Sequence, residues 1–252
     1  MSIVNRAEPF YRNALNHLAD GSVPFMIGGA YALRAYTGVV RETKDLDVFC
    51  KPEDHPRIVA LLTSAGYQTE VTYPHWLAKA FHRDHTVDII FSSGNSVCRV
   101  DDVWVRHSHP TTMLGVPVRL IPPEEMIWSK LYVQDRGRFD GADIAHLLLK
   151  RGETLDWHRL LMRVDADAEA LFAHLINFRF VYPSERGLVP EWVMRELWSR
   201  IDKQLETPPP PERICRGTLL TPYDYEIDVT KWGYRDARTP IPAFPAPPAG
   251  RA

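Results

Sequence analysis

Two aspartates one residue apart inside a short apolar run are the residues of this chain best suited to chemistry. They are Asp45 and Asp47, in the segment 45–50 that reads DLDVFC. Acidic side chains are uncommon in strands and are rarely buried without a partner. Residues two apart on a strand point to the same face, about 6–7 Å apart along it. Two carboxylates on one face repel each other unless a cation lies between them, so the pattern predicts a divalent-metal site.

A third acid stands in another apolar run further along the chain. Asp88 lies in the segment 87–91, which reads VDIIF. Two acids from one strand and one from a neighbouring strand could hold two divalent ions, with phosphate oxygens and waters completing each coordination shell. Asp45, Asp47 and Asp88 are therefore the candidate catalytic and metal-binding residues, and Mg²⁺ or Mn²⁺ is the expected cofactor.

A glycine pair precedes these acids. Gly28 and Gly29 follow the apolar run 23–27 and come before a segment with a helical pattern. Without side chains the backbone can approach a phosphate closely, and the start of the following helix offers unpaired N–H groups. Taken alone, the pair is equally consistent with a tight turn between strand and helix. No GxxxxGK[ST] motif occurs in the chain, so the sequence does not support a P-loop ATPase.

The elements that must position these residues alternate between strand and helix patterns over residues 1–121, which we expect to form one domain. The following domain, residues 122–205, has helical periodicity. We therefore expect an α/β (α+β) fold, with a mixed sheet and flanking helices followed by a helical domain. The expected strands are 23–27, 46–50, 67–72, 76–82, 86–91, 103–106 and 116–121. The expected helices are 4–19, 30–36, 52–66, 124–134, 139–150, 156–163, 166–181 and 190–204.

The last part of the chain, residues 206–252, differs in composition. It holds ten of the 21 prolines, and proline is excluded from helix interiors and central strands. We expect a Pro-rich tail that wraps the body, without regular helix or central strand and with its last dozen residues disordered. Its aromatic side chains could stack on bases, but packing on the core is the favoured interpretation. They are Tyr223, Tyr225, Trp232 and Tyr234.

The overall composition indicates a soluble cytoplasmic protein. The 252 residues carry a net charge of −2, which argues against broad binding to nucleic acid or to an anionic membrane. The three cysteines, Cys50, Cys98 and Cys215, form no CxxC pair, so reduced thiols in a cytosol fit best. We expect neither a signal peptide nor a membrane-spanning segment. His107 and His109 alternate like metal ligands, but no cysteine completes a set, and a zinc site is disfavoured.

These motifs, in this order, resemble the DNA polymerase β-like nucleotidyltransferase superfamily. Its signature is a Gly-Gly or Gly-Ser step, a short helix, an acid–apolar–acid strand and a later third acid, as at Gly28-Gly29, Asp45-Leu46-Asp47 and Asp88. The branch that resembles the chain most contains small bacterial abortive-infection, toxin–antitoxin and antibiotic-modifying enzymes. An Arg-x-Thr-x-Asp-apolar-Asp run is common there and matches Arg41 and Thr43 ahead of the two aspartates.

A second resemblance lies downstream, at a Lys…Arg-x-Asp-x-x-Asp pattern. It is similar to the helix that lines the nucleotide cleft in the abortive-infection type. The matching residues are Lys130, Arg138, Asp140 and Asp143. From the residues alone, the two aspartates could instead form a solvated helix stripe, or Asp140 could cap the helix.

The resemblance implies metal-dependent transfer of a nucleoside monophosphate from an NTP, such as ATP, to a hydroxyl acceptor, with release of pyrophosphate. The acceptor could be a small molecule, a protein or an RNA end, although net charge does not indicate RNA. In this family Asp45 and Asp47 would ligate both metals, Asp88 would bind the second metal and accept the proton, and Lys130 and Arg138 would balance the triphosphate. The alternative is a non-catalytic nucleotide- or partner-binding module of a toxin–antitoxin system, with a small helical protein as partner.

Overall fold

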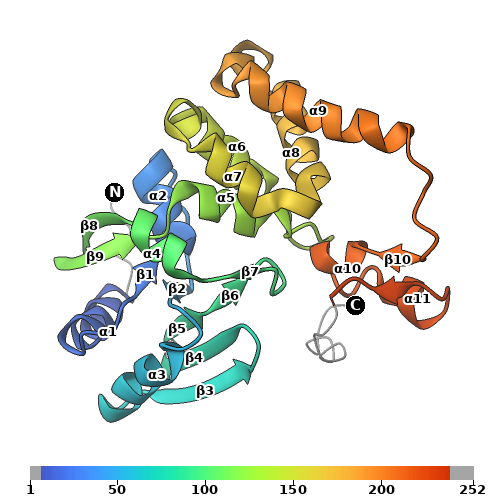
Figure 1. The fold of residues 1–252 in the computed structure, drawn as a ribbon. Coiled ribbons are helices and arrows are strands. Elements are labelled where there is room, and N and C mark those ends of the chain that lie inside the picture. Colours follow the sequence, from blue (N-terminus) through green and yellow to red (C-terminus); the bar gives the residue numbers. More distant parts are fainter. Residues whose placement is uncertain (1–6, 84, 239–252) are drawn as a thin grey trace. The chain divides into compact units, whose positions relative to one another are not determined.

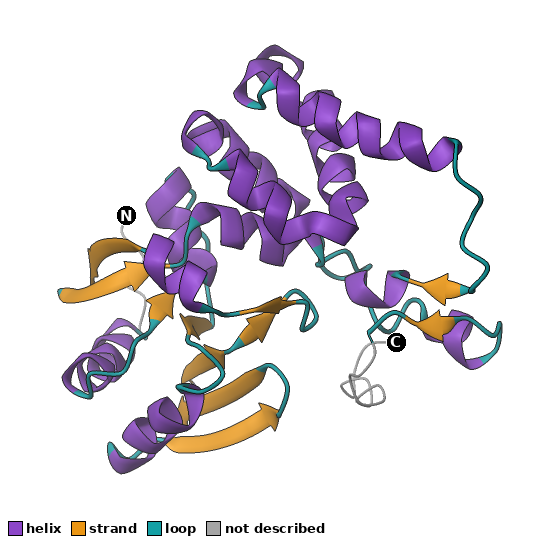
Figure 2. Ribbon diagram, viewed as in Figure 1, coloured by secondary structure: helices purple, strands orange, loops and turns teal. Residues whose placement is uncertain are grey.

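The computed structural model describes residues 7–83 and 85–238, and the chain divides into two compact units (Figure 1). The first unit comprises Met1–Met126 and the second Ile127–Ala252. The predicted mixed α/β class is confirmed, because a mixed sheet with flanking helices occupies the first unit and a group of helices occupies the second (Figure 2). None of the helices within the described ranges is long and apolar enough to cross a membrane.

Among the described residues of the first unit, seven strands form one sheet in the order β3-β4-β5-β2-β1-β9-β8. The pairs β2–β5 and β1–β9 are parallel, and the other neighbouring pairs are antiparallel. A separate ladder joins two short strands, β6 and β7. The strands are β1 Met26–Ile27, β2 Asp45–Phe49, β3 Gln68–Tyr73, β4 Leu77–His82, β5 His85–Ile90, β6 Ser92–Ser93, β7 Cys98–Arg99, β8 His109–Met113 and β9 Val116–Leu120.

The helices of the first unit pack on this sheet: α1 and α3 contact each other and several strands, and α2 contacts β2. Strand alternation explains where the core lies. In β2, Leu46 and Val48 are fully buried, whereas Asp45 and Asp47, which alternate with them, are partly exposed, so one face of the strand joins the core and the other carries the acids. These helices are α1 Glu8–Asp20, α2 Gly29–Thr37, α3 His55–Ser64 and α4 Asp102–His107.

One expected strand is wrong. Residues 103–106, read as strand, belong to helix α4, because the Asp101 carboxylate accepts hydrogen bonds from the N–H groups of Val103 and Trp104 at 2.9 and 3.3 Å. This N-cap stabilises the start of a helix, although the β-branched residues in the segment favour a strand. Strand β8 was not expected. The other expected strands are present with bounds shifted by a few residues.

The second unit is helical from its start, as expected. Its core consists of side chains from α6 to α9, among them Leu148, Leu160, Leu171, Phe178 and Leu197. Helix α5 begins before the unit boundary and continues across it. The helices are α5 Pro123–Leu131, α6 Gly141–Arg151, α7 Trp157–Val164, α8 Ala168–Val181 and α9 Glu191–Leu205, with short 3-10 helices η1 Gly152–Thr154, η2 Asp165–Asp167 and η3 Pro183–Leu188.

The Pro-rich segment after α9 is more regular than expected. Its prolines are far enough apart to leave room for one-turn helices and two-residue strands. These elements are β10 Ile214–Cys215, α10 Gly217–Leu220, α11 Glu226–Thr230 and β11 Arg235–Asp236. Strands β10 and β11 pair in parallel. Of its aromatic side chains, which are expected to pack on the core, Tyr223 and Trp232 are 42% and 55% exposed. The last dozen residues, expected to be disordered, and residues 4–6 of the first expected helix lie outside the described residues.

Candidate active site

The three predicted aspartates share one face of the sheet. Strands β2 and β5 pair in parallel with Asp47 opposite Asp88, and Asp45 lies two residues before Asp47. Partners across neighbouring strands project to the same side. The opposite face of these strands carries fully buried aliphatic side chains, including Leu46, Val87 and Ile89. The register of this strand pair thus brings together carboxylates that lie about forty positions apart in sequence.

The glycine pair lies directly against these carboxylates. The Gly28 N–H donates to the Asp47 carbonyl at 3.0 Å. Gly29, the first residue of α2, has φ +53°, and a Cβ there would lie 1.6 Å from Asp47 Oδ2. A Cβ on Gly28 would lie 2.2 Å from the Phe49 ring. Only glycines allow the N-terminus of α2 to approach the carboxylate this closely, and the helix dipole favours negative charge there.

Thr43, ahead of the aspartates, contacts the first of them. Its hydroxyl donates to Asp45 Oδ1 at 2.8 Å and lies 3.0 Å from the Asp45 carbonyl oxygen. Thr43 therefore orients the first carboxylate. Arg41 is exposed on the loop that leads to β2.

Lys79 belongs to the same face, and sequence reasoning did not identify it. In the antiparallel pair β4–β5, Lys79 stands opposite Asp88, and its Nζ lies 2.7 Å from Asp88 Oδ1. Burial raises the pKa of Asp88 above its ordinary value, against the opposing effect of the Lys79 hydrogen bond and charge. The only signal was a lysine in an apolar strand segment, LAKAFH, whose register could not be read from the sequence.

Tyr11 is a second residue that sequence reasoning did not single out. It lies in α1, is fully buried, and its hydroxyl has no hydrogen-bond partner among the described residues. Burial raises the pKa of this hydroxyl well above its ordinary value, and the neighbouring Tyr31 and the negative charges of Asp45, Asp47 and Asp88 raise it further. The phenol therefore stays protonated and remains a hydrogen-bond donor. In sequence it is indistinguishable from an ordinary core aromatic residue.

In the second unit, the predicted Lys-Arg-Asp-Asp set forms one cluster. Lys130 Nζ donates to Asp140 and Asp143 at 2.7 Å each, and Arg138 donates twice to Asp140 at 3.0 Å. Asp140 and Asp143 are only 7% and 4% exposed, so the solvated-stripe interpretation is wrong. Asp140 occupies the N-cap position of α6, but its side chain makes no capping hydrogen bond.

The charges of this cluster depend on one another. Burial pushes the pKa of Asp140 upward, but the hydrogen bond from Arg138 and the charge of Lys130 outweigh it, so the pKa lies below its ordinary value. Lys130 is thus shared between two buried carboxylates. A buried ion pair of this kind is costly to break, because the remaining charge has no compensation.

The donor chemistry of the first unit suits a hard divalent ion, because carboxylate oxygens are the ligands that Mg²⁺ and Mn²⁺ prefer. The unsatisfied Tyr11 hydroxyl and the Gly29 backbone leave polar groups for a ligand beside the carboxylates. Within the described ranges, however, no group of three His, Cys, Asp or Glu side chains is arranged to hold a metal as it stands.

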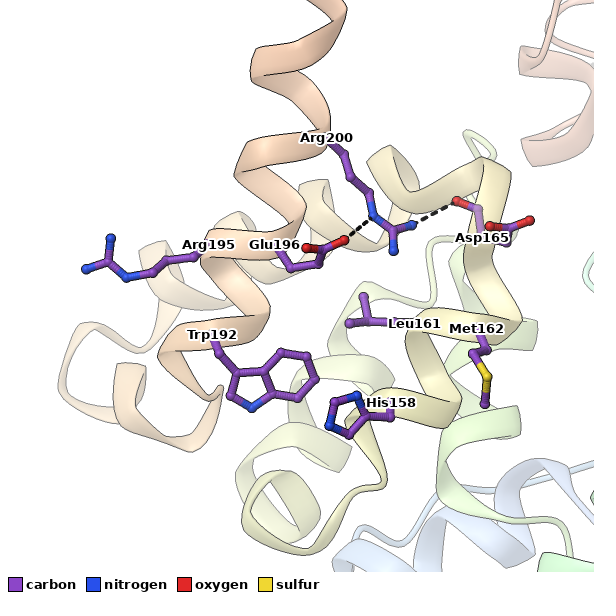
Figure 3. A pocket seen from close by; sticks show the side chains of 8 residues that line it. All are labelled: His158, Leu161, Met162, Asp165, Trp192, Arg195, Glu196 and Arg200. Carbon is purple, nitrogen blue, oxygen red and sulfur yellow. Dashed lines mark hydrogen bonds and ion pairs between the residues drawn. The ribbon is translucent and has the colours of Figure 1, made fainter.

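A separate cavity of about 690 Å³ lies between α7 and α9 in the second unit (Figure 3). At one end, the rings of Trp192 and His158 stack with centroids 4.4 Å apart. At the other, Arg200 donates to Glu196 at 2.9 Å and to the Asp165 carbonyl at 3.4 Å. Because this arginine is neutralised by its own neighbour, this end of the cavity does not offer an unpaired positive charge to a triphosphate.

Comparison with solved structures finds nucleotidyltransferases of low sequence identity. The antibiotic-resistance factor ANT(2'')-Ia is 18% identical, with a TM-score of 0.46 over 69% of this chain and 96% of that chain. The lincosamide antibiotic adenylyltransferase LnuA is 19% identical, with a TM-score of 0.41 over 57% and 96%. An antigenic nucleotidyltransferase-like protein from Paracoccidioides brasiliensis is 16% identical, with a TM-score of 0.45 over 74% and 94%. No protein of curated function matches the chain.

The family comparison is more extensive. A family described as uncharacterised nucleotidyltransferase matches residues 12–175, which is well over half of the chain. The match includes the three aspartates, the glycine pair and the Lys130 cluster. The chain therefore belongs to this nucleotidyltransferase family.

Proposed function

We propose that this nucleotidyltransferase depends on a divalent metal and moves a nucleoside monophosphate from an NTP to a hydroxyl acceptor, with release of pyrophosphate. The observation that supports this most is the parallel register of β2 and β5, with Asp47 beside Asp88 and Asp45 on the same face. Carboxylates grouped in this way repel one another unless cations lie among them.

The chemistry makes few covalent demands on the protein. The acceptor oxygen forms a bond to the α-phosphorus, the bond from that phosphorus to the β-phosphate oxygen breaks, and pyrophosphate leaves. Asp88 is the proposed acceptor of the hydroxyl proton. Asp45, Asp47 and Asp88 are the proposed ligands of Mg²⁺ or Mn²⁺, which when bound would neutralise charge on the triphosphate.

The residues around the carboxylates have proposed roles in holding the nucleotide. Gly28 and Gly29 leave the first N–H groups of α2 open to a phosphate. Thr43 keeps Asp45 in one orientation, and Arg41 is proposed to contact the phosphates. Tyr11 supplies a buried hydroxyl donor.

In the second unit, Lys130, Arg138, Asp140 and Asp143 are the further proposed nucleotide-binding residues. The two aspartates hold Lys130, so Arg138, whose side chain is the more exposed cation, is the better candidate to balance phosphate charge. Their position within the matched family region supports this assignment. The acceptor is proposed only as a hydroxyl of a small molecule, a protein or an RNA end.

Calorimetry tests the proposal directly. Each NTP is titrated with Mg²⁺ into the wild type and into the Asp45→Ala, Asp47→Ala double variant, and Asp88→Asn is assayed for pyrophosphate release. We expect metal-dependent binding of one or more NTPs, its loss in the double variant, and no turnover by Asp88→Asn. Asp102→Asn, which removes an exposed acid paired with Lys51, is the matched control and should behave as wild type.

The competing function is that of a non-catalytic module that binds a nucleotide or a small helical partner protein. A folded wild type that binds no NTP, or an Asp88→Asn variant with near-normal turnover, would contradict the proposed chemistry. The first of these results would favour the partner-binding alternative.

A further inference from the structure

The cavity between α7 and α9 in the second unit has no part in the proposed nucleotide chemistry. Its volume of about 690 Å³ falls within the range of roughly 300–1,000 Å³ that small-molecule sites occupy. Large apolar side chains line it and are still open to solvent: Met162 is 72% exposed and Trp192 is 40% exposed, whereas Leu161 in its wall is buried. Exposed apolar side chains around a hollow of this size mark a binding site for a small molecule.

The indole of Trp192 is held in place by a second ring. It stacks on the His158 imidazole, with centroids 4.4 Å apart and planes at 21° to each other (Figure 3). The imidazole comes from the first turn of α7 and the indole from the first turn of α9. Because the stacked indole is still partly exposed, it offers an ordered aromatic surface to a flat ring or to a cation.

The charged side chains that line the cavity are paired, with one exception. Arg200 forms an ion pair with Glu196. Arg195 forms another with Glu191. The Asp165 carbonyl oxygen accepts a hydrogen bond from Arg200 at 3.4 Å, but its carboxylate makes no ion pair or hydrogen bond with any other described residue. The uncompensated charge of this lining is therefore negative, and it complements a cation instead of an anion.

The backbone of Asp165 is also unusual. This residue ends α7 with φ +29° and ψ −99°, in the positive-φ region that favours glycine. A residue with a side chain is strained there, and strained residues cluster at ligand sites, where the surrounding structure holds them. In this chain the strained position is the one that brings an unpaired carboxylate to the cavity.

We infer that this cavity binds a small organic cation that combines a flat apolar ring with an ammonium group. The ring packs against Trp192 and Met162, and the ammonium group pairs with the Asp165 carboxylate. All of these residues belong to the second unit, and none has a proposed role in nucleotide transfer. The inference therefore goes beyond the proposed function and does not depend on it.

Three ligands that share a naphthyl ring and differ in charge test the inference. They are 2-(2-naphthyl)ethylammonium, 2-(2-naphthyl)ethanol and 3-(2-naphthyl)propionate, and ligand-observed NMR measures the Kd of each. We expect the ammonium to bind about fivefold to thirtyfold more tightly than the alcohol, because an ion pair and a cation–π contact both favour it. The propionate should bind most weakly. The indole N–H signal of Trp192, identified by its loss in Trp192→Phe, should shift when the ammonium is added.

Variants with matched controls locate the charge and the ring. Asp165→Asn keeps a side chain that tolerates positive φ, and it should lower the preference for the ammonium over the alcohol by about twofold to fivefold. Asp202→Asn, which removes an exposed acid of α9 outside the cavity, should leave that preference unchanged. Trp192→Leu should weaken the binding of both ligands. Trp198→Leu, which removes an exposed indole outside the cavity, should weaken neither.

A further variant separates this site from the carboxylates of the first unit, which could also attract a cation. Asp45→Ala, Asp47→Ala should bind the ammonium with the Kd of the wild type. Loss of binding in that variant, an unmoved Trp192 signal, an unchanged preference in a folded Asp165→Asn, or a wild type that binds the ammonium no better than the propionate would each overturn the inference. Circular dichroism establishes that each variant is folded. None of these results bears on NTP binding, which is measured separately.

Discussion

At Gly29, both space and backbone conformation exclude a side chain. An added Cβ would overlap Asp47 Oδ2, and φ is +53°. We predict that Gly29→Ala loses NTP binding and destabilises the fold by more than the 1–2 kcal/mol or so expected for a left-handed alanine alone. Gly38→Ala, at the other end of α2, is the matched control, since it has φ +79° and open space. Urea denaturation measures the unfolding free energy and calorimetry measures NTP binding. Equal losses of unfolding free energy and of NTP binding in the two variants would show that the overlap with Asp47 adds no cost of its own.

At Tyr11, stability and binding should respond in opposite directions. The hydroxyl is buried without a hydrogen-bond partner in the described structure, so Tyr11→Phe removes an unsatisfied polar atom. We predict a free energy of unfolding that is unchanged or higher by up to about 2 kcal/mol, together with weaker binding of NTP and Mg²⁺. Denaturation and calorimetry on the same variant test this. A marked loss of stability would instead mean that the hydroxyl serves the folded protein itself.

At the scale of elements, Lys130 joins the end of α5 to the start of α6 through two buried carboxylates. Replacing it leaves Asp143 without that cation, so we predict that Lys130→Met costs about 3–5 kcal/mol of unfolding free energy. Lys150→Met, on the exposed side of α6, should cost less than about 1 kcal/mol. Urea denaturation compares them, and similar small losses would show that the cluster is not a structural link.

The same cluster should make stability depend on pH in the acid range. The pKa of Asp140 is lower in the folded chain than its unfolded value of about 3.9. Its contribution to stability is therefore present above the unfolded pKa and is lost as the pH falls through the folded pKa. We predict that the difference in melting temperature between wild type and Asp140→Asn is constant above about pH 5 and narrows below about pH 4. A difference that stays constant down to pH 2 would contradict this.

At the scale of the whole molecule, a ligand that binds only the folded chain raises its stability by mass action. At a nucleotide concentration about one hundred times Kd, the gain is about 2.7 kcal/mol. We predict this stabilisation for an NTP with Mg²⁺ and its loss when EDTA removes the metal. Thermal unfolding monitored by circular dichroism measures it, with the Asp45→Ala, Asp47→Ala variant as the control that should not respond. An equal shift in the presence of EDTA would show metal-independent binding.

Local patterns were enough to predict the elements that carry the site. The alternation of acids and aliphatics in β2 and β5 made both strands recognisable, and the glycine pair marked the start of α2. Periodicity also predicted the helices of the second unit. Where a single capping side chain or a short turn decides the local structure, as at Asp101 and in the segment after α9, these patterns failed, because they average over several residues.

The sequence by itself determined which residues could do the chemistry: three acids in apolar strands, a glycine pair and a spaced set of charges, each evident from its unusual local context. Only the tertiary structure decided their neighbours. Lys79 pairs with Asp88 because of the register of two strands, and Tyr11 lies within the electrostatic influence of the carboxylates because α1 packs on the sheet. Register and packing are set by the sum of many long-range contacts, and no short stretch of sequence contains that information.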